Sequence, residues 1–209
     1  MRRYNNFAAG WRSGRERVLT ERHIQVLSGS PREDKMTKLE YICSKFEALE
    51  EQIAHCYFLL QERFLTNPGL AKFWAEAALE EMMHSSILRY CREHHLVGLD
   101  ENVDVTMAAR VDDLLDTVKG IVADSWITVD EAFYASLLIE SSEIDDAYEK
   151  LTRRLAMDHP LLYEAIRANL RMHHDRFADG AAEFAKDKTY ADAFRALSRT
   201  ARSNGSSQR

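Results

Sequence analysis

Residues 73–84 read FWAEAALEEMMH, and this stretch decides the fold because its apolar positions recur at the spacing of one helix face. The same face continues from Leu70 to Cys91. Glu81 and His84 lie on it, one helical turn apart, where the pattern places the core. Buried charge is costly unless it is paired or bound to a metal. An inward Glu-x-x-His pair is a motif from which helix bundles build metal sites, so it directs attention to the other helices.

The composition of the chain is that of a globular all-α protein. Its 209 residues suit one domain with a sizeable core, and 45% of them are hydrophobic and 30% charged. Only three prolines and eight glycines interrupt apolar patterns with a period of about 3.6 residues. The net charge of −6 gives no reason to expect nucleic acid as a partner.

Three features of the sequence bear on the cellular compartment. No apolar run approaches the roughly 18 residues that span a membrane, and no signal-peptide pattern is present. The three cysteines are scattered and form no Cys-x-x-Cys pair, which favours buried thiols in a reducing environment. We therefore expect a cytoplasmic protein that does not contact a membrane. The absence of Cys-x-x-Cys pairs also excludes a zinc ribbon or a rubredoxin module within this chain.

The chain is expected to divide into three parts. Residues 1–35 are polar and locally basic, and we interpret them as an N-terminal extension that ends in a linker at Ser28-Gly29-Ser30-Pro31. Residues 36–187 carry the helical patterns of the main domain. Residues 188–209 are expected to form a short helix, Tyr190 to Arg199, followed by a disordered tail.

Four long helices are predicted within the main domain, at residues 37–65, 70–94, 129–156 and 161–186. A tight turn at Asn67-Pro68-Gly69 makes the first two antiparallel neighbours. The connection from Leu96 to Ile127 is long and contains an amphipathic segment of its own. This pattern predicts a four-helix bundle with one long crossover between the second and third helices.

Each of the four predicted helices places polar side chains on its inner face or at the edge of that face. These candidate metal ligands are Glu50, Glu81 with His84, Glu140 with Glu143, and His173. Glu51 falls on the solvent side of the first helix, and His174 lies towards the edge of the fourth. A single inward histidine is usually a hydrogen-bonded core residue. Inward carboxylates or histidines on all four helices, however, favour a metal site. Carboxylate oxygen and imidazole nitrogen together suit iron, manganese or zinc.

The motif set resembles the ferritin-like superfamily and, within it, the rubrerythrin-like di-iron carboxylate proteins. The resemblance covers about residues 37–185 and rests on Glu50 followed seven residues later by Tyr57, on Trp74-x6-Glu81-x-x-His84, and on Glu140-x-x-Glu143 followed by Tyr148. It implies a ferritin-like four-helix bundle that binds iron. It also implies an oxidoreductase acting on peroxide or dioxygen, which would need an external electron donor because no rubredoxin module is present.

The resemblance also implies a role for each ligand. Glu50 would be a terminal ligand, Glu81 would bridge two irons and His84 would cap one of them. Glu140 and Glu143 would serve the other iron, which His173 would cap. A homodimer is expected as well, through an exposed remainder of aromatic residues that includes Tyr41, Phe58 and either Phe133 or Tyr134.

One position departs from the family pattern. The fourth helix of the family carries a second Glu-x-x-His, but Leu170 stands three residues before His173. The site therefore lacks one bridging carboxylate, and one of the two ions would bind weakly or not at all. The alternative interpretation is a degenerate relative with a partial or empty metal site that acts as a binding or structural protein. Metal storage is a third and less favoured interpretation.

Overall fold

The computed structural model describes residues 37–96, 105–142 and 144–206, and these residues form eight α-helices and no β-strand. The all-α prediction is confirmed. The chain divides after Lys35, and the fold described here belongs to the second unit, residues 36–209. The predicted basic extension, residues 1–35, lies outside the described residues.

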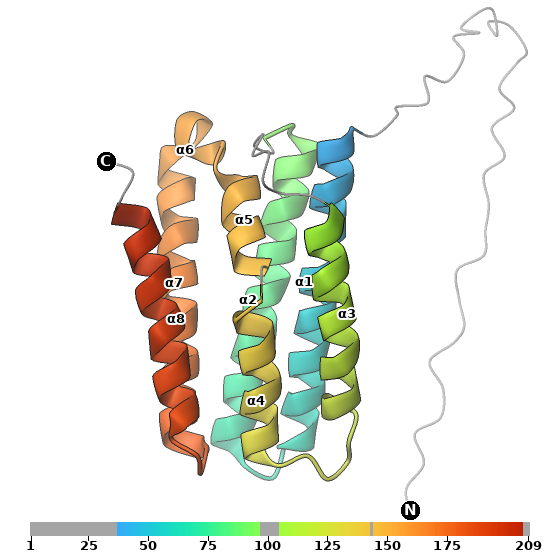
Figure 1. The fold of residues 1–209 in the computed structure, drawn as a ribbon, viewed down its shortest axis with the longest axis vertical. Coiled ribbons are helices and arrows are strands. Elements are labelled where there is room, and N and C mark those ends of the chain that lie inside the picture. The colour runs from blue at the N-terminus through green and yellow to red at the C-terminus, as the bar shows by residue number, and fades with distance from the viewer. Residues whose placement is uncertain (1–36, 97–104, 143, 207–209) are drawn as a thin grey trace, which may run out of the picture. The chain divides into compact units, whose positions relative to one another are not determined.

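Helices α1 (Lys38–Arg63) and α2 (Pro68–Glu93) form an antiparallel pair, joined by a short turn (Figure 1). Local signals fix where they begin. The Thr37 hydroxyl accepts from the backbone N–H of Glu40 in a capping box, and Asn67 caps α2 with Pro68 in its first turn. Both helices therefore start and end within two residues of their predicted bounds.

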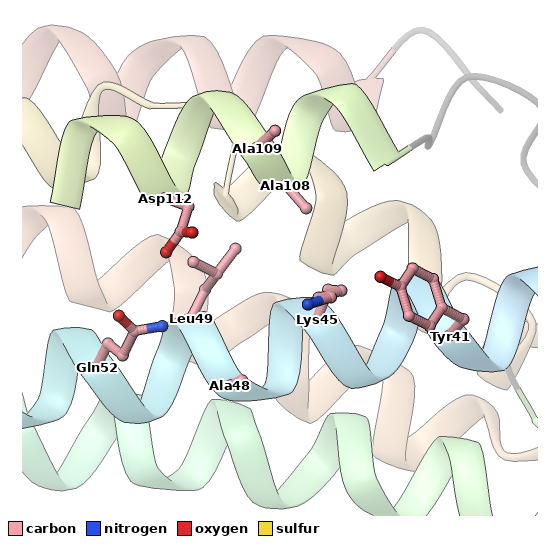
Figure 2. A pocket seen from close by; sticks show the side chains of 8 residues that line it. All are labelled: Tyr41, Lys45, Ala48, Leu49, Gln52, Ala108, Ala109 and Asp112. Carbon is pink, nitrogen blue, oxygen red and sulfur yellow. The ribbon is translucent and has the colours of Figure 1, made fainter. Parts of the chain in front are cut away.

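The connection between α2 and the next core helix contains α3 (Val105–Val122), which runs beside α1 (Figure 1). Its buried face includes Val111, Leu115 and Val118, in agreement with the amphipathic segment of the sequence. A surface pocket lies between α1 and α3 (Figure 2). It is lined by Tyr41, Lys45, Ala48, Leu49, Gln52, Ala108, Ala109 and Asp112, so none of the predicted metal ligands reaches it.

The prediction of a single helix over residues 129–156 is wrong. Three helices occupy it: α4 (Val129–Glu140), α5 (Ile144–Thr152) and the short α6 (Leu155–Asp158). The first break falls at two serines, whose hydroxyls compete for backbone groups. Ser141 Oγ donates to the carbonyl of Leu137 at 2.6 Å, and Ser142 Oγ accepts from the N–H of Ile144 at 3.3 Å. Figure 1 shows α5 continuing the direction of α4 after this interruption.

Helix α7 (Pro160–Phe184) is followed by α8 (Thr189–Ser206), which packs along it (Figure 1). The prediction for this segment was wrong in length, because α8 includes residues 203–206, which were expected to be disordered. Within the predicted part of this helix, the rings of Phe194 and Phe177 stack with centroids 5.2 Å apart and hold α8 against α7. Residues 207–209 lie outside the described part of the chain.

An aromatic layer fills the core between α1, α2, α4 and α7. Tyr57 stacks on Trp74 at 5.7 Å and meets Phe177 at 5.6 Å, while Phe133 lies 5.1 Å from Trp74. Phe133 has no exposed surface and is excluded as a dimer contact, whereas its neighbour Tyr134 is 45% exposed. The layer packs against the polar cluster described next, since the ring of His173 lies 5.0 Å from that of Phe177.

No helix in the described residues combines the length and the apolar character that crossing a membrane requires.

Candidate metal centre

Five of the six predicted ligands meet in the interior. They come from the middle of α1, the middle of α2, the last residue of α4 and the middle of α7, and none is more than 4% exposed: Glu50, Glu81, His84, Glu140 and His173. The sixth, Glu143, lies outside the described residues. Glu51 is exposed, as the helical pattern predicted. Helical periodicity on four separate segments thus converges on one buried cluster.

Glu81 lies between the two histidines and offers each of them a different oxygen. Its Oε2 is 2.9 Å from Nδ1 of His84, and its Oε1 is 3.3 Å from Nε2 of His173. The two imidazole rings have their centroids 5.7 Å apart. A carboxylate with one oxygen directed to each side is arranged as a bridging ligand between two ions would be.

Glu50 completes one side of this arrangement. Its Oε2 is 3.9 Å from Nδ1 of His84, and its buried Oε1 has no hydrogen-bond partner among the described residues. Burial, followed by the nearby carboxylate of Glu81, raises the pKa of Glu50 well above its ordinary value. For Glu81 the opposing influence of His173 and His84 outweighs burial and lowers the pKa. The pKa values of the two carboxyl groups therefore shift in opposite directions, with Glu50 favouring its neutral form and Glu81 its ionised form.

Glu140 completes the other side. Its Oε2 is 2.9 Å from Nε2 of His173, while its Oε1 accepts a hydrogen bond of 2.6 Å from the hydroxyl of Tyr57. Burial and the neighbouring Glu140 raise the pKa of Tyr57 well above its ordinary value, so the phenol stays protonated and remains a donor. This bond holds one oxygen of Glu140 and leaves the other facing the histidine.

Sequence reasoning missed two residues of the cluster, Asp145 and His174. Nε2 of His174 is 2.9 Å from Oδ2 of Asp145 and 3.6 Å from Oε2 of Glu140. The sequence placed His174 towards the edge of the inner face of its helix, but its side chain is buried and only 5% exposed. Asp145 could not be found by periodicity. In a continuous helix, a residue five positions after Glu140 would point in a different direction from Glu140.

Three groups of side chains in the described residues could each hold a cation. They are Glu50 with Glu81 and His84, Glu81 with Glu140 and His173, and Glu140 with Asp145 and His174. Within each group the ligand atoms all lie within 4.8 Å of one another. Neighbouring groups share one carboxylate, so the cluster is a continuous row and not three separate sites.

In each of the two inner histidines, His84 and His173, the ring nitrogen that faces away from Glu81 contacts another side chain, which orients the ring. His173 Nδ1 is 2.8 Å from Oε2 of Glu80, and Glu80 in turn pairs with Arg176. His84 Nε2 is 3.1 Å from Oδ1 of Asn169. A ring nitrogen that donates to an oxygen leaves the opposite nitrogen free to bind a metal. These contacts therefore direct Nε2 of His173 and Nδ1 of His84 towards the shared carboxylate.

The orienting role of Glu80 can be tested by substitution. We expect Glu80→Ala to weaken metal binding by about tenfold, the lower end of the range for lost partners of ligating histidines. Glu80→Gln should cost less, because its amide oxygen still accepts from Nδ1 of His173. Competitive titration with a chelating dye measures both, and Glu76→Ala, on the same helix and half-exposed, is the control. Unchanged affinity in Glu80→Ala would show that His173 needs no such support.

The fold and this cluster together define an all-helical protein with a buried row of carboxylates and histidines suited to metal ions. No family model, no curated protein and no solved structure matches the chain.

Proposed function

We propose that this chain is a ferritin-like, rubrerythrin-like protein that binds two iron ions and carries out redox chemistry on peroxide or dioxygen. The observation that carries the proposal is the position of Glu81, with one oxygen towards each of two buried histidines. In this proposal α1, α2, α4 with α5, and α7 are the four helices of the bundle, and α3 belongs to the crossover.

The donor set fits a pair of divalent cations. Glu50, Glu81 and Glu140 supply three carboxylate ligands, and His84 and His173 add nitrogen ligands. The nearby Asp145 brings the negative charges of the row to four, which two such ions would neutralise. Leaving these groups buried without a cation costs hydrogen bonds, since Glu50 Oε1 is unpartnered in the described part of the chain. Oxygen and nitrogen ligands together favour iron or manganese, with zinc also possible.

The protein would contribute positioning and exclusion of water. Iron bound here would supply the electrons for reducing peroxide or dioxygen. Glu81 would hold the two positions at a fixed separation, and the Tyr57 hydroxyl would keep Glu140 in one orientation. The aromatic layer below His173 keeps water from that side of the cluster. Because no rubredoxin module was found in the sequence, electrons would come from a separate protein or a small reductant.

The redox part of the proposal is tested by turnover. After anaerobic reconstitution with ferrous iron, the protein is expected to hold about two irons and to consume added peroxide in the presence of a reductant. His173→Ala should lose this activity, whereas His55→Ala, an exposed histidine on α1, should retain it. Protein that holds two irons and consumes peroxide or dioxygen no faster than free iron would contradict the redox assignment.

A second candidate is a degenerate bundle with a structural or binding role. Leu170 is buried at the position where the family has a glutamate, and the carboxylates already pair with the histidines. This alternative predicts one ion or none in the natural protein and a gain in stoichiometry for Leu170→Glu. Two ions in the natural protein would exclude it.

A further inference from the structure

We propose that Glu140, Asp145 and His174 form an entry site for divalent cations, from which each ion passes to the inner positions by ligand exchange at Glu140. The inference rests on the proposed function, since it requires that the inner positions bind cations. It adds a direction of loading and two residues, Asp145 and His174, that would not hold an ion permanently.

The side chains of this group are built to receive a cation. His174 is about nineteen-twentieths buried (5% exposed), and neither of its ring nitrogens has a regular hydrogen bond within the described residues. Its Nε2 nonetheless points at two carboxylates, at 2.9 Å from Asp145 and 3.6 Å from Glu140. The buried imidazole and the two carboxylates that it faces together offer three ligand atoms, one nitrogen and two oxygens, of the types that suit transition metals.

The group also lies at the end of the row that meets solvent. The side chain of Asp145 is 23% exposed although its Oδ2, which faces His174, is buried; the side chains of Glu140 and His173 are only 2% and 1% exposed. A hydrated cation can therefore approach Asp145 and shed water as carboxylate oxygens replace it. The surface pocket of Figure 2 is lined by none of these residues, so it provides no comparable contact with the cluster.

Glu140 connects the entry group to the inner positions. Its Oε2 faces both histidines, at 2.9 Å from Nε2 of His173 and 3.6 Å from Nε2 of His174. The two imidazole rings lie 5.8 Å apart, centroid to centroid. An ion held by His174 can thus exchange that ligand for His173 while it keeps Glu140, so it is never without a carboxylate.

The charges of the row indicate that the entry site is occupied only in passing. Four carboxylates neutralise two divalent ions, and a third ion would leave a net positive charge in a buried site, which is costly. Two ions should therefore settle at the inner positions, where Glu81 is shared. The entry group would be filled during loading and vacated when the second ion reaches its place.

The test is the rate of cobalt(II) loading, followed by absorbance after rapid mixing under anaerobic conditions. His174→Gln and Asp145→Asn are each expected to load about tenfold more slowly than the natural protein, a cost typical of lost supporting groups at metal sites. His174→Gln should still bind two ions at saturation, by equilibrium dialysis, because His174 belongs to neither inner position. His55→Gln, at an exposed position on α1, should load at the natural rate.

Each possible result of the loading experiment either supports or overturns the entry site. Natural loading rates in the variants would overturn the entry site and leave the proposed metal centre intact. Fewer than two ions at saturation in His174→Gln would also overturn it, because His174 would then be a permanent ligand. If either variant fails to fold, the other decides. A natural protein that binds no cobalt, manganese or iron would overturn the proposed function itself.

Discussion

Glu81→Ala is expected to abolish the binding of both metal ions, the largest effect of any single substitution in the cluster. Glu81 belongs to two of the three ligand groups, so its loss removes one ligand from each inner position. We expect apparent affinity to fall by more than about 100-fold, beyond the range for lost second partners. Metal content of the purified and reconstituted protein, by mass spectrometry, measures this directly.

The control for this substitution is Glu76→Ala, on the same helix. Glu76 pairs with Lys72 at the surface and lies outside the cluster, so its loss should leave the metal content unchanged. Glu81→Gln keeps the shape of the side chain and separates the loss of charge from the loss of volume. If Glu81→Ala retained two ions per chain, the bridging role would be wrong.

The metal-free protein should lose stability as pH rises from about 6.5 to about 10. Burial alone would lower the pKa of His173, but Glu140 and Glu81 outweigh it and raise that pKa to about 10. Between the unfolded value of 6.5 and this folded value, the native state binds a proton that the unfolded chain releases. Stability from this group is therefore complete below pH 6.5 and is lost through the folded pKa.

Bound metal should reverse the trend, because the cation replaces the proton as the positive charge between the carboxylates. At a free metal concentration of about 1,000 times Kd, we expect the Tm to rise by on the order of 10 °C. Thermal unfolding with chelator and with manganese, across this pH range, measures both effects. His173→Gln should flatten the alkaline slope of the metal-free protein. A metal-free Tm that rises with pH would contradict the assigned charges.

Much of the helical structure could be predicted because its signals are local. The starts of α1 and α2 follow from the capping box of Thr37 and Glu40 and from the Asn67 cap, which satisfy backbone N–H groups there, and from Pro68 in the first turn of α2. Five candidate ligands were found because each lies on the apolar stripe of its own helix or, for Glu50, at the edge of that stripe, where a polar residue stands out. Their convergence needed no tertiary information beyond the assumption that the stripes face one core.

The remaining part of the site depends on a break that periodicity cannot show. Extending one helix through residues 141–143 places Glu143 one turn beyond Glu140 and turns Asp145 away. The serine hydroxyls end α4 instead, and α5 begins in a new register that brings Asp145 to His174. A signal was present in the pair Ser141-Ser142, since serine competes for backbone hydrogen bonds. Its effect on register is a tertiary outcome.

His174 was misplaced for a related reason. Adjacent residues on a helix differ by about 100° in direction, so only one of His173 and His174 can lie at the centre of a stripe. The second reaches the cluster because α5 lies beside α7 and carries a carboxylate towards it. Sequence periodicity treats the core as a single direction, whereas α7 faces α2 on one side and α5 on another.

The most direct test of the central claim is anomalous diffraction from crystals grown with iron or manganese. The expected result is two adjacent peaks that share Glu81, one beside Glu50 and His84 and the other beside Glu140 and His173. Well-diffracting crystals from metal-saturated solution that show no anomalous peak at Glu81 would contradict the claim that this cluster is a metal centre.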